Sequence, residues 1–194
     1  MTRKITLAAL APALLLGGCV SFGGDAPDSL LTLTPSATAP AGVAAQGAQG
    51  SALAIIPFEA TKALDVTRVP VQVTDTELAY LQDAVWVDRP ARLFGQLVAE
   101  TIRSRTGRMV VDGDDPGVGA IDRLHGTLRS FGYDARSREA VVVFDAVRNG
   151  DGSAVVSRRF EARVAVAEPE AGFVGPALNR AANQVAREVA EWIG

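Results

Sequence analysis

The sequence predicts an α+β fold, in which an antiparallel β-sheet carries two helices packed on one face. Apolar and polar residues alternate through 122–133 and 156–166, the pattern of strands that expose one face to solvent. Apolar residues recur at every third or fourth position through 90–105 and 173–193, as they do in helices that bury one side. A sheet with both helices on one face buries both patterns together.

The N-terminus has the sequence of a bacterial lipoprotein signal. Arg3 and Lys4 precede an apolar stretch at 5–16, which resembles the start of a secretory signal. Roughly 12 apolar residues are too few to cross about 30 Å of bilayer hydrocarbon, so this stretch is not predicted to span a membrane. The stretch ends in a lipobox, formed by Leu16, Gly17, Gly18 and Cys19. We therefore expect residues 1–18 to be removed as a signal peptide.

Cys19 is the predicted first residue of the mature chain and its site of lipidation. Two acyl chains on its sulfur and one on its amine, palmitate among them, would hold it firmly, since each buried CH₂ contributes about 0.8 kcal/mol. An unmodified cysteine after an ordinary signal is the alternative. In the bacterial lipoproteins that this N-terminus resembles, Asp in the second position favours the inner membrane. Val20 therefore indicates the periplasmic face of the outer membrane.

Charge and size limit the function classes. Removing 1–18 takes away Arg3 and Lys4, so 19 basic residues become 17 against 22 acidic ones, a net charge near −5. Nucleic acid and anionic headgroups both favour a basic surface, so neither is predicted as a partner. The remaining roughly 175 residues suit one domain with a single core. Because Cys19 is the sole cysteine, no intramolecular disulfide is possible.

Composition divides the mature chain into an anchored tether, 19–50, and a periplasmic α+β domain, 51–194. Residues 30–33 alternate briefly before Pro35 and predict a short strand within this region. The alternative is that they are part of the tether without strand structure. Residues 36–50 are small and polar, with one Val and no charge. Such a segment buries too little apolar area to offset its ordering entropy, so we expect a flexible loop.

The first half of the domain should contain short strands and one helix. Strands are predicted at 52–58 and 66–73, and 77–87 is apolar enough for a hairpin or short edge strands. Pro90 should open a helix behind an Asp88 cap. Thr106-Gly107 should end that helix.

The second half should form three neighbouring antiparallel strands and a final helix. After a short strand at 109–111 and a turn-rich loop at 113–119, strands are expected at 122–133, 140–147 and 156–166. The last two should be joined by the turn at 149–152, whose Asn-Gly and Asp-Gly pairs are a strong hairpin signal. The final helix has a buried stripe formed by Leu178, Ala181, Val185, Val189 and Trp192.

Candidate chemistry is sparse. His125, the only histidine, lies on the polar face of its predicted strand without a recognisable nucleophile, so we interpret it as a surface residue. Asp112, Asp114 and Asp115 lack the EF-hand spacing and indicate a solvated loop. The glycines of 117–119 precede a strand rather than a helix, unlike a dinucleotide-binding loop. One histidine and one lipidated cysteine cannot supply a zinc site. No enzyme activity, metal or cofactor is predicted.

Several short motifs occur in a recognisable order after the lipobox. They are Thr32 to Pro35, Leu53 to Pro57, Tyr80 with Trp86 and Pro90, Leu124 to Phe131, and Arg159-Phe160 after an Asp-Gly turn. This order resembles the ABC-type transport auxiliary lipoprotein family, whose members accompany MCE-domain lipid transporters, including the paraquat-inducible type. The resemblance extends over roughly 30–192.

The resemblance implies a non-enzymatic outer-membrane lipoprotein. Its periplasmic domain would dock an MCE-domain protein, which an ABC permease and ATPase drive from the inner membrane. Phe58, Tyr80 and Trp86 are candidate partner contacts because aromatic residues dominate interface energies, with core packing as the alternative.

Other functions also suit an anchored domain. A periplasmic lipid-binding carrier and an outer-membrane assembly factor are the alternatives, and a hydrolase using His125 is the least favoured. Pairing of an exposed sheet edge between copies would give a homo-oligomer.

Overall fold

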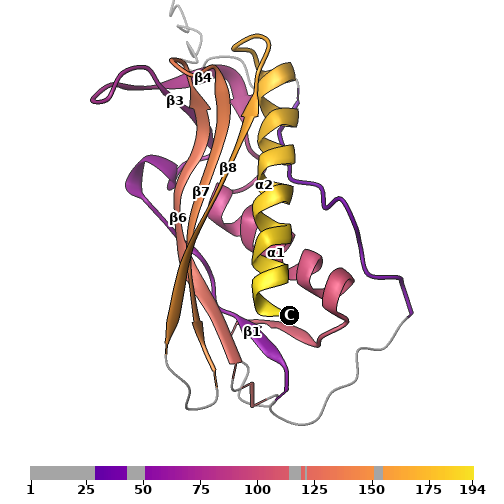
Figure 1. The fold of residues 1–194 in the computed structure, drawn as a ribbon. Coiled ribbons are helices and arrows are strands. Elements are labelled where there is room, and N and C mark those ends of the chain that lie inside the picture. The colour runs from indigo at the N-terminus through magenta and orange to yellow at the C-terminus, as the bar shows by residue number, and fades with distance from the viewer. Residues whose placement is uncertain (1–28, 43–50, 114–118, 121, 151–154) are drawn as a thin grey trace, which may run out of the picture.

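The computed structural model describes residues 29–42, 51–113, 119–120, 122–150 and 155–194 (Figure 1). These residues form a mixed sheet with two α-helices, which confirms the α+β class. The strands are β1 (Leu53–Ile55), β2 (Glu59–Ala60), β3 (Arg68–Gln72), β4 (Leu78–Val85), β5 (Val110–Asp112), β6 (Asp122–Asp134), β7 (Glu139–Asn149) and β8 (Val156–Ala165). The helices are α1 (Pro90–Thr106), α2 (Ala171–Ile193) and the short 3₁₀ helix η1 (Lys62–Leu64).

Strand β6 organises the sheet. One of its edges pairs antiparallel with β7, which pairs antiparallel with β8. Its other edge pairs in parallel with β1, β2 and β3 in turn, while β5 extends β1 and β4 extends β3. The three neighbouring antiparallel strands are therefore confirmed, but the sheet as a whole is mixed rather than antiparallel. Alternation along a strand reports which face is buried, and it carries no information about the direction of the neighbouring strand.

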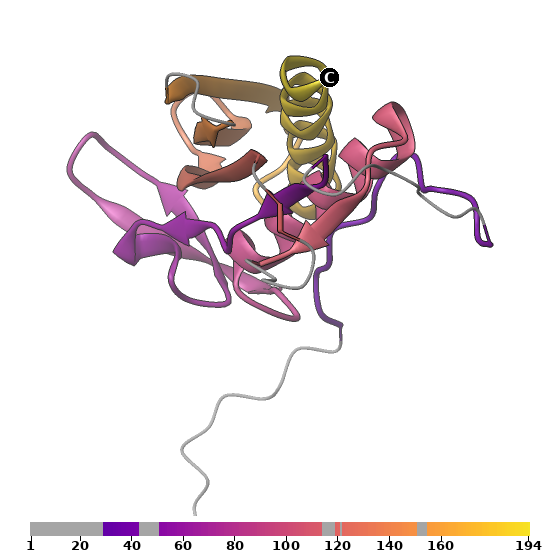
Figure 2. The ribbon, with the colours of Figure 1, turned by 90° about the horizontal axis from the view of Figure 1, so that it is seen from below.

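Both helices pack on one face of the sheet, and the strands curve around one side of this helical layer (Figures 1 and 2). Aromatic side chains fill the space between the layers. The ring of Phe144 lies 4.6 Å from that of Phe58 and 5.2 Å from that of Phe94. The ring of Trp86 lies 5.3 Å from that of Phe131. These rings come from five segments of the chain and belong to one core.

The ends of α1 agree with the sequence except at the N-cap. Pro90 occupies the first turn, and Gly107 ends the helix in a left-handed conformation with φ 67°. The N-cap is Arg89, so the predicted Asp88 cap is wrong. The Asp88 carboxylate instead accepts a hydrogen bond from the Arg89 backbone N–H at 2.7 Å and pairs with Arg92 at 3.4 Å. Asp88 therefore stabilises the turn before the helix.

The remaining predicted loops lie partly outside the described residues, which leave out 43–50, 114–118 and 151–154. Antiparallel pairing of β7 with β8 agrees with the predicted hairpin. None of the helices in the described part of the chain has the length and apolar character needed to cross a membrane.

Candidate functional site

Residues 31–36 form an extended segment, which we call the strap, on the outside of the helical layer (Figure 1). Its side chains alternate, with Leu31, Leu33 and Pro35 half-buried and the residues between them exposed. Leu31 forms one parallel bridge with Trp86: its N–H donates to Val85 at 2.7 Å, and its carbonyl accepts from Val87 at 2.9 Å. The predicted strand at 30–33 is therefore reduced to a single bridge, but it packs on the domain rather than belonging to a free tether.

Two asparagines of α2 bind the backbone of the strap. The Thr34 N–H donates to Asn179 Oδ1 at 2.9 Å, and the Ser36 N–H donates to Asn183 Oδ1 at 2.7 Å. Asn183 Nδ2 donates in turn to the carbonyl oxygens of Thr34 and Asn179, at 2.9 and 2.8 Å. Asn183 is only 4% exposed. Its amide therefore gives the strap hydrogen bonds that a neighbouring strand would otherwise supply.

The strap also contacts α1. Leu33 shares a cleft with Leu93 and Leu97, and just beyond the strap the Ala39 N–H donates to Glu100 Oε1 at 2.7 Å. At the other end of the strap, a Cβ on Gly175 of α2 would lie 2.8 Å from a methyl group of Leu31. The strap thus spans both helices, and it includes the start of the segment that composition predicts to be a flexible loop.

The predicted lipobox, Leu16 to Cys19, lies outside the described residues. Among the candidate partner contacts, Trp86 is 1% exposed and Phe58 is 9% exposed, so core packing describes both. Tyr80 is half-buried on β4, with the Arg68 guanidinium 4.3 Å from its ring centre. Only Tyr80 of the three offers an accessible ring. Aromatic composition alone cannot separate the two roles, because aromatic residues are favoured in cores as well as interfaces.

The candidate chemical residues occupy surface positions. His125 is half-buried on β6, as expected for a strand histidine on the polar face. Asp112 pairs with Arg103 at 3.5 Å, whereas Asp114, Asp115 and Gly117 lie outside the described part of the chain. Within the described ranges, no group of histidine, cysteine and acidic side chains could hold a metal ion.

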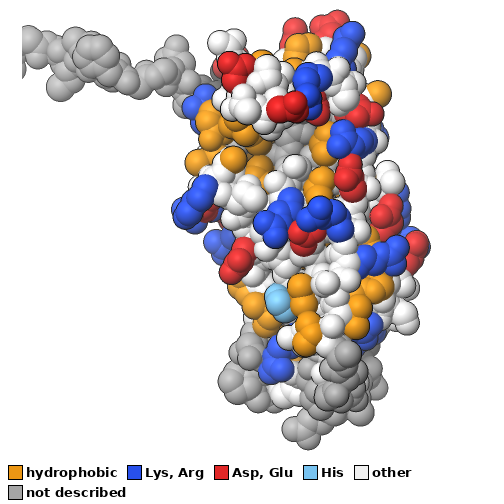
Figure 3. Space-filling model, turned by 60° about the vertical axis from the view of Figure 1, so that its left-hand side comes forward, with side chains coloured by type: hydrophobic (Ala, Val, Ile, Leu, Met, Phe, Trp, Pro, Cys, Tyr) orange, Lys and Arg blue, Asp and Glu red, His pale blue; other side chains and the backbone are white. Residues whose placement is uncertain are grey.

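The outer face of the sheet, opposite the helices, carries interleaved charges (Figure 3). Asp145 on β7 accepts hydrogen bonds from Arg129 on β6 at 2.8 Å and from Arg159 on β8 at 2.6 and 2.8 Å. The bonds from Arg159, together with that from Arg129, lower the pKa of Asp145 to about 2. This carboxylate therefore stays ionised and links three strands, so it is poorly suited to proton transfer at neutral pH.

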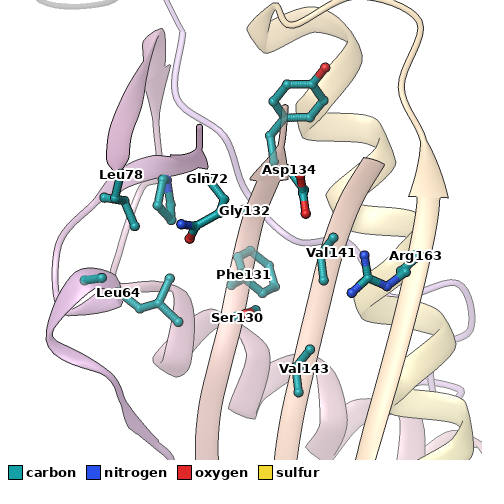
Figure 4. A pocket seen from close by; sticks show the side chains of 13 residues that line it. Leu64, Gln72, Leu78, Ser130, Phe131, Gly132, Asp134, Val141, Val143 and Arg163 are labelled. Atoms are coloured by element: carbon teal, nitrogen blue, oxygen red, sulfur yellow. The ribbon is translucent and has the colours of Figure 1, made fainter. Parts of the chain in front are cut away.

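A pocket of about 160 Å³ lies on this face between η1, the β3–β4 hairpin and the three long strands (Figure 4). Val141, Val143 and Gly132 line it, and a Cβ on Gly132 would overlap the carbonyl oxygen of Pro70. Arg163 on its rim already pairs with Glu161 at 2.6 Å and Glu139 at 3.4 Å. This volume is well below the roughly 300–1,000 Å³ of typical small-molecule sites.

The sequence did contain a signal for the strap site. Asn183 falls between Ala182 and Val185, inside the buried stripe of α2, with Asn179 one turn earlier. A buried amide requires hydrogen-bond partners, so a polar residue at such a position predicts a contact with another backbone segment. Asn179 and Asn183 are the functional candidates that the motif-based analysis missed.

Comparisons with known proteins agree with this structure. The family model for the ABC-type transport auxiliary lipoprotein component matches residues 31–190. Protein XCC0632 from Xanthomonas campestris, of family DUF330, superposes with a TM-score of 0.70 at 19% identity, covering 85% of this chain and 94% of that one. A second solved structure, of an uncharacterized protein, superposes with a TM-score of 0.65 at 16% identity, covering 75% and 94%. No curated protein matches the sequence. At these identities the structures support the fold alone.

Proposed function

Because the chain belongs to the ABC-type transport auxiliary lipoprotein family, we propose that it is a non-enzymatic accessory lipoprotein of an MCE-type lipid transport system. In this role, Cys19 is acylated and holds the protein on the periplasmic face of the outer membrane. The domain then docks the MCE-domain protein that an ABC permease and ATPase drive from the inner membrane.

The strap is the observation that carries this proposal. It connects the residues that follow Cys19 directly to α1 and α2, so force on the anchor reaches the helical layer through the bonds at Thr34 and Ser36. Roughly 11 residues separate Cys19 from Leu31. Even fully extended, a connection of that length spans at most about 43 Å. This short connection keeps the domain near its membrane, as a docking protein requires.

The packed core supports docking over the lipid-carrier alternative. An acyl carrier of this architecture would hold its ligand between the sheet and the helices, where the rings of Phe58, Phe94 and Phe144 are in mutual contact. The accessible features are instead on the outside, in the strap and the charged sheet face.

Affinity purification of the tagged, lipidated chain from gently solubilised envelopes tests the proposed partner. Mass spectrometry should recover an MCE-domain protein together with its permease and ATPase, and recovery should fall sharply for the Cys19→Ser variant. Recovery of a different envelope machine would support the assembly-factor alternative. Recovery of bound lipid without protein partners would support the carrier alternative.

A separate experiment tests the outer-membrane location. Density-gradient fractionation should find the protein with outer-membrane markers, and Val20→Asp should move it toward the inner-membrane fractions. Because this substitution leaves Cys19 and the domain unchanged, it separates the choice of membrane from the attachment to a membrane. Finding the unmodified chain in inner-membrane fractions would contradict the proposed sorting.

A further inference from the structure

Two exposed apolar side chains flank the bridge by which the chain enters the domain. Leu30 is 52% exposed and Val87 is 54% exposed. The bridge between Leu31 and Trp86 places these paired residues on one face, toward the core. Leu30 precedes Leu31 and Val87 follows Trp86, so the two lie diagonally across the parallel bridge, and their exposure shows that both side chains face away from the core.

Charged side chains follow Val87 in the sequence, and one ion pair joins them to the end of η1. Arg92 pairs with Asp88 at 3.4 Å, and Asp65 pairs with Arg89 at 3.3 Å and with Lys62 at 3.9 Å. The group has three basic and two acidic members, so it is locally basic in an acidic chain. Lys62 and Arg92 are highly exposed. Apolar side chains bordered by exposed basic ones suit the headgroup layer of a bilayer.

The chain before Leu30 identifies the occupant of this surface. Ser29 is the first described residue, and Cys19 lies only ten positions before it. Even fully extended, the connection from Cys19 to Leu30 spans at most about 40 Å. We propose that Leu30 and Val87 form a membrane seat, which contacts the headgroup layer of the bilayer that carries the anchor. The seat rests on the proposed function through the acylation of Cys19.

The seat gives the domain a preferred orientation. Leu31 contacts α2 near Gly175, whereas the equally apolar Val156 lies at the other end of this helix, where its partner Arg148 bonds the carbonyl of Ile193. Eighteen residues of helix separate Gly175 from Ile193, which is about 27 Å. Val156, which is 47% exposed, should therefore stay clear of the membrane while Val87 touches it.

Site-specific fluorescence tests the seat. Cys19 is the only cysteine, and acylation blocks its thiol, so Val87→Cys and Val156→Cys each introduce one reactive thiol for an environment-sensitive dye. The acylated full chain is reconstituted in vesicles of phosphatidylethanolamine and phosphatidylglycerol. We expect the dye at position 87 to shift its emission to shorter wavelength, and nitroxide-headgroup lipids to quench it at least twofold more than the dye at position 156. Adding Leu30→Ser to the Val87→Cys chain should reduce the difference.

Two other outcomes are separable. Equal emission and quenching at positions 87 and 156, with acylation verified by mass spectrometry, would overturn the seat and leave the anchor intact. An unacylated Cys19, which would react with the dye itself, would overturn the anchor and the seat with it.

Discussion

The side-chain amide of Asn183 donates a hydrogen bond to the carbonyl oxygen of Thr34 at 2.9 Å, across 149 positions of sequence. The same amide accepts from the Ser36 N–H at 2.7 Å. One buried side chain thus bonds a backbone carbonyl and a backbone N–H of the strap, and it joins the segment that follows the proposed anchor to the last helix. The structure therefore makes the strap part of the domain.

Replacing Asn183 with Ala should release the strap. The change leaves the Ser36 N–H and the Thr34 carbonyl without their partner, and we expect it to lower the free energy of unfolding by about 2 kcal/mol. Amide hydrogen exchange at 34–36 should accelerate strongly, while exchange in β7 stays slow. Glu191→Ala, at an exposed ion pair with Arg105 near the end of the same helix, is the control and should leave exchange at 34–36 unchanged and cost no more than about 0.5 kcal/mol. Unchanged exchange at 34–36 in Asn183→Ala would show that Asn183 does not hold the strap.

Two glycines of α2 offer a matched pair of substitutions. A Cβ on Gly175 would meet a Leu31 methyl group at 2.8 Å, whereas a Cβ on Gly172 would meet nothing within 4 Å. Gly175→Ala should therefore displace Leu31 and accelerate hydrogen exchange around its bridge to Trp86. Gly172→Ala should raise stability slightly, by up to about 1 kcal/mol, because alanine favours helix. Equal exchange at Leu31 in both variants would show that this contact does not hold the strap.

Local patterns predicted the elements well, because helix and strand periodicity is set by which side chains are buried. The helix beginning at Pro90 and the alternating strand that became β6 both follow from such patterns. The parallel pairing of β1 with β6 could not be predicted from local patterns, because it depends on contacts between residues about 70 positions apart. Asp88 shows that sequence patterns locate the start of a helix less exactly than its existence. Its carboxylate accepts a hydrogen bond from the Arg89 N–H, rather than from an N–H in the first turn of α1.

The candidate site was less predictable than the fold. Trp86 carries a family-like motif but is enclosed in the core, where its indole N–H has no hydrogen-bond partner among the described residues. Asn183 belongs to none of the sequence motifs, yet it makes the contact that holds the strap. Both side chains are buried, so what separates them is the group that each meets in three dimensions, the aromatic core for Trp86 and the strap backbone for Asn183.

Asp122 lies at the end of the domain opposite to the membrane seat, and replacing it should lower the stability of the fold. Asp122 is 9% exposed, and its carboxylate accepts from Arg108 at 2.9 Å and from Arg148 at 2.8 and 3.0 Å. Arg148 also donates to the carbonyl of Ile193 at 3.2 Å, which ties β7 to the end of α2. Asp122→Asn leaves two guanidinium groups without their counter-charge, so we expect the free energy of unfolding to fall by about 3 kcal/mol in urea denaturation.

The control for this substitution is Asp112→Asn. Asp112 also pairs with an arginine, Arg103, but its side chain is 80% exposed. The change should therefore cost no more than about 0.5 kcal/mol. Equal losses in the two variants would show that burial of the Asp122 pair does not matter.

Both carboxylates should make the protein less stable in acid. Burial alone would raise the pKa of Asp122, but the hydrogen bonds from Arg148 and Arg108 outweigh burial and lower it. Arg159 and Arg129 lower the pKa of Asp145 from 3.8 to about 2. A carboxyl group whose pKa is lower in the folded state binds protons more readily when unfolded, so stability rises with pH through this range. The contribution of Asp145 is therefore complete above its unfolded pKa and disappears as the pH falls toward 2.

Urea midpoints measured between pH 7 and pH 2 test this dependence on the outer sheet face. Asp145→Asn should be less stable than the unmodified chain at pH 7, because Arg129 and Arg159 lose their shared carboxylate. The two curves should converge as the pH approaches 2, where both chains lack the charge. Glu59→Gln, an exposed change without an ion pair among the described residues, should follow the unmodified chain throughout. A constant difference between Asp145→Asn and the unmodified chain would mean that Asp145 acts through packing, and that the charge linking β6, β7 and β8 contributes little to stability.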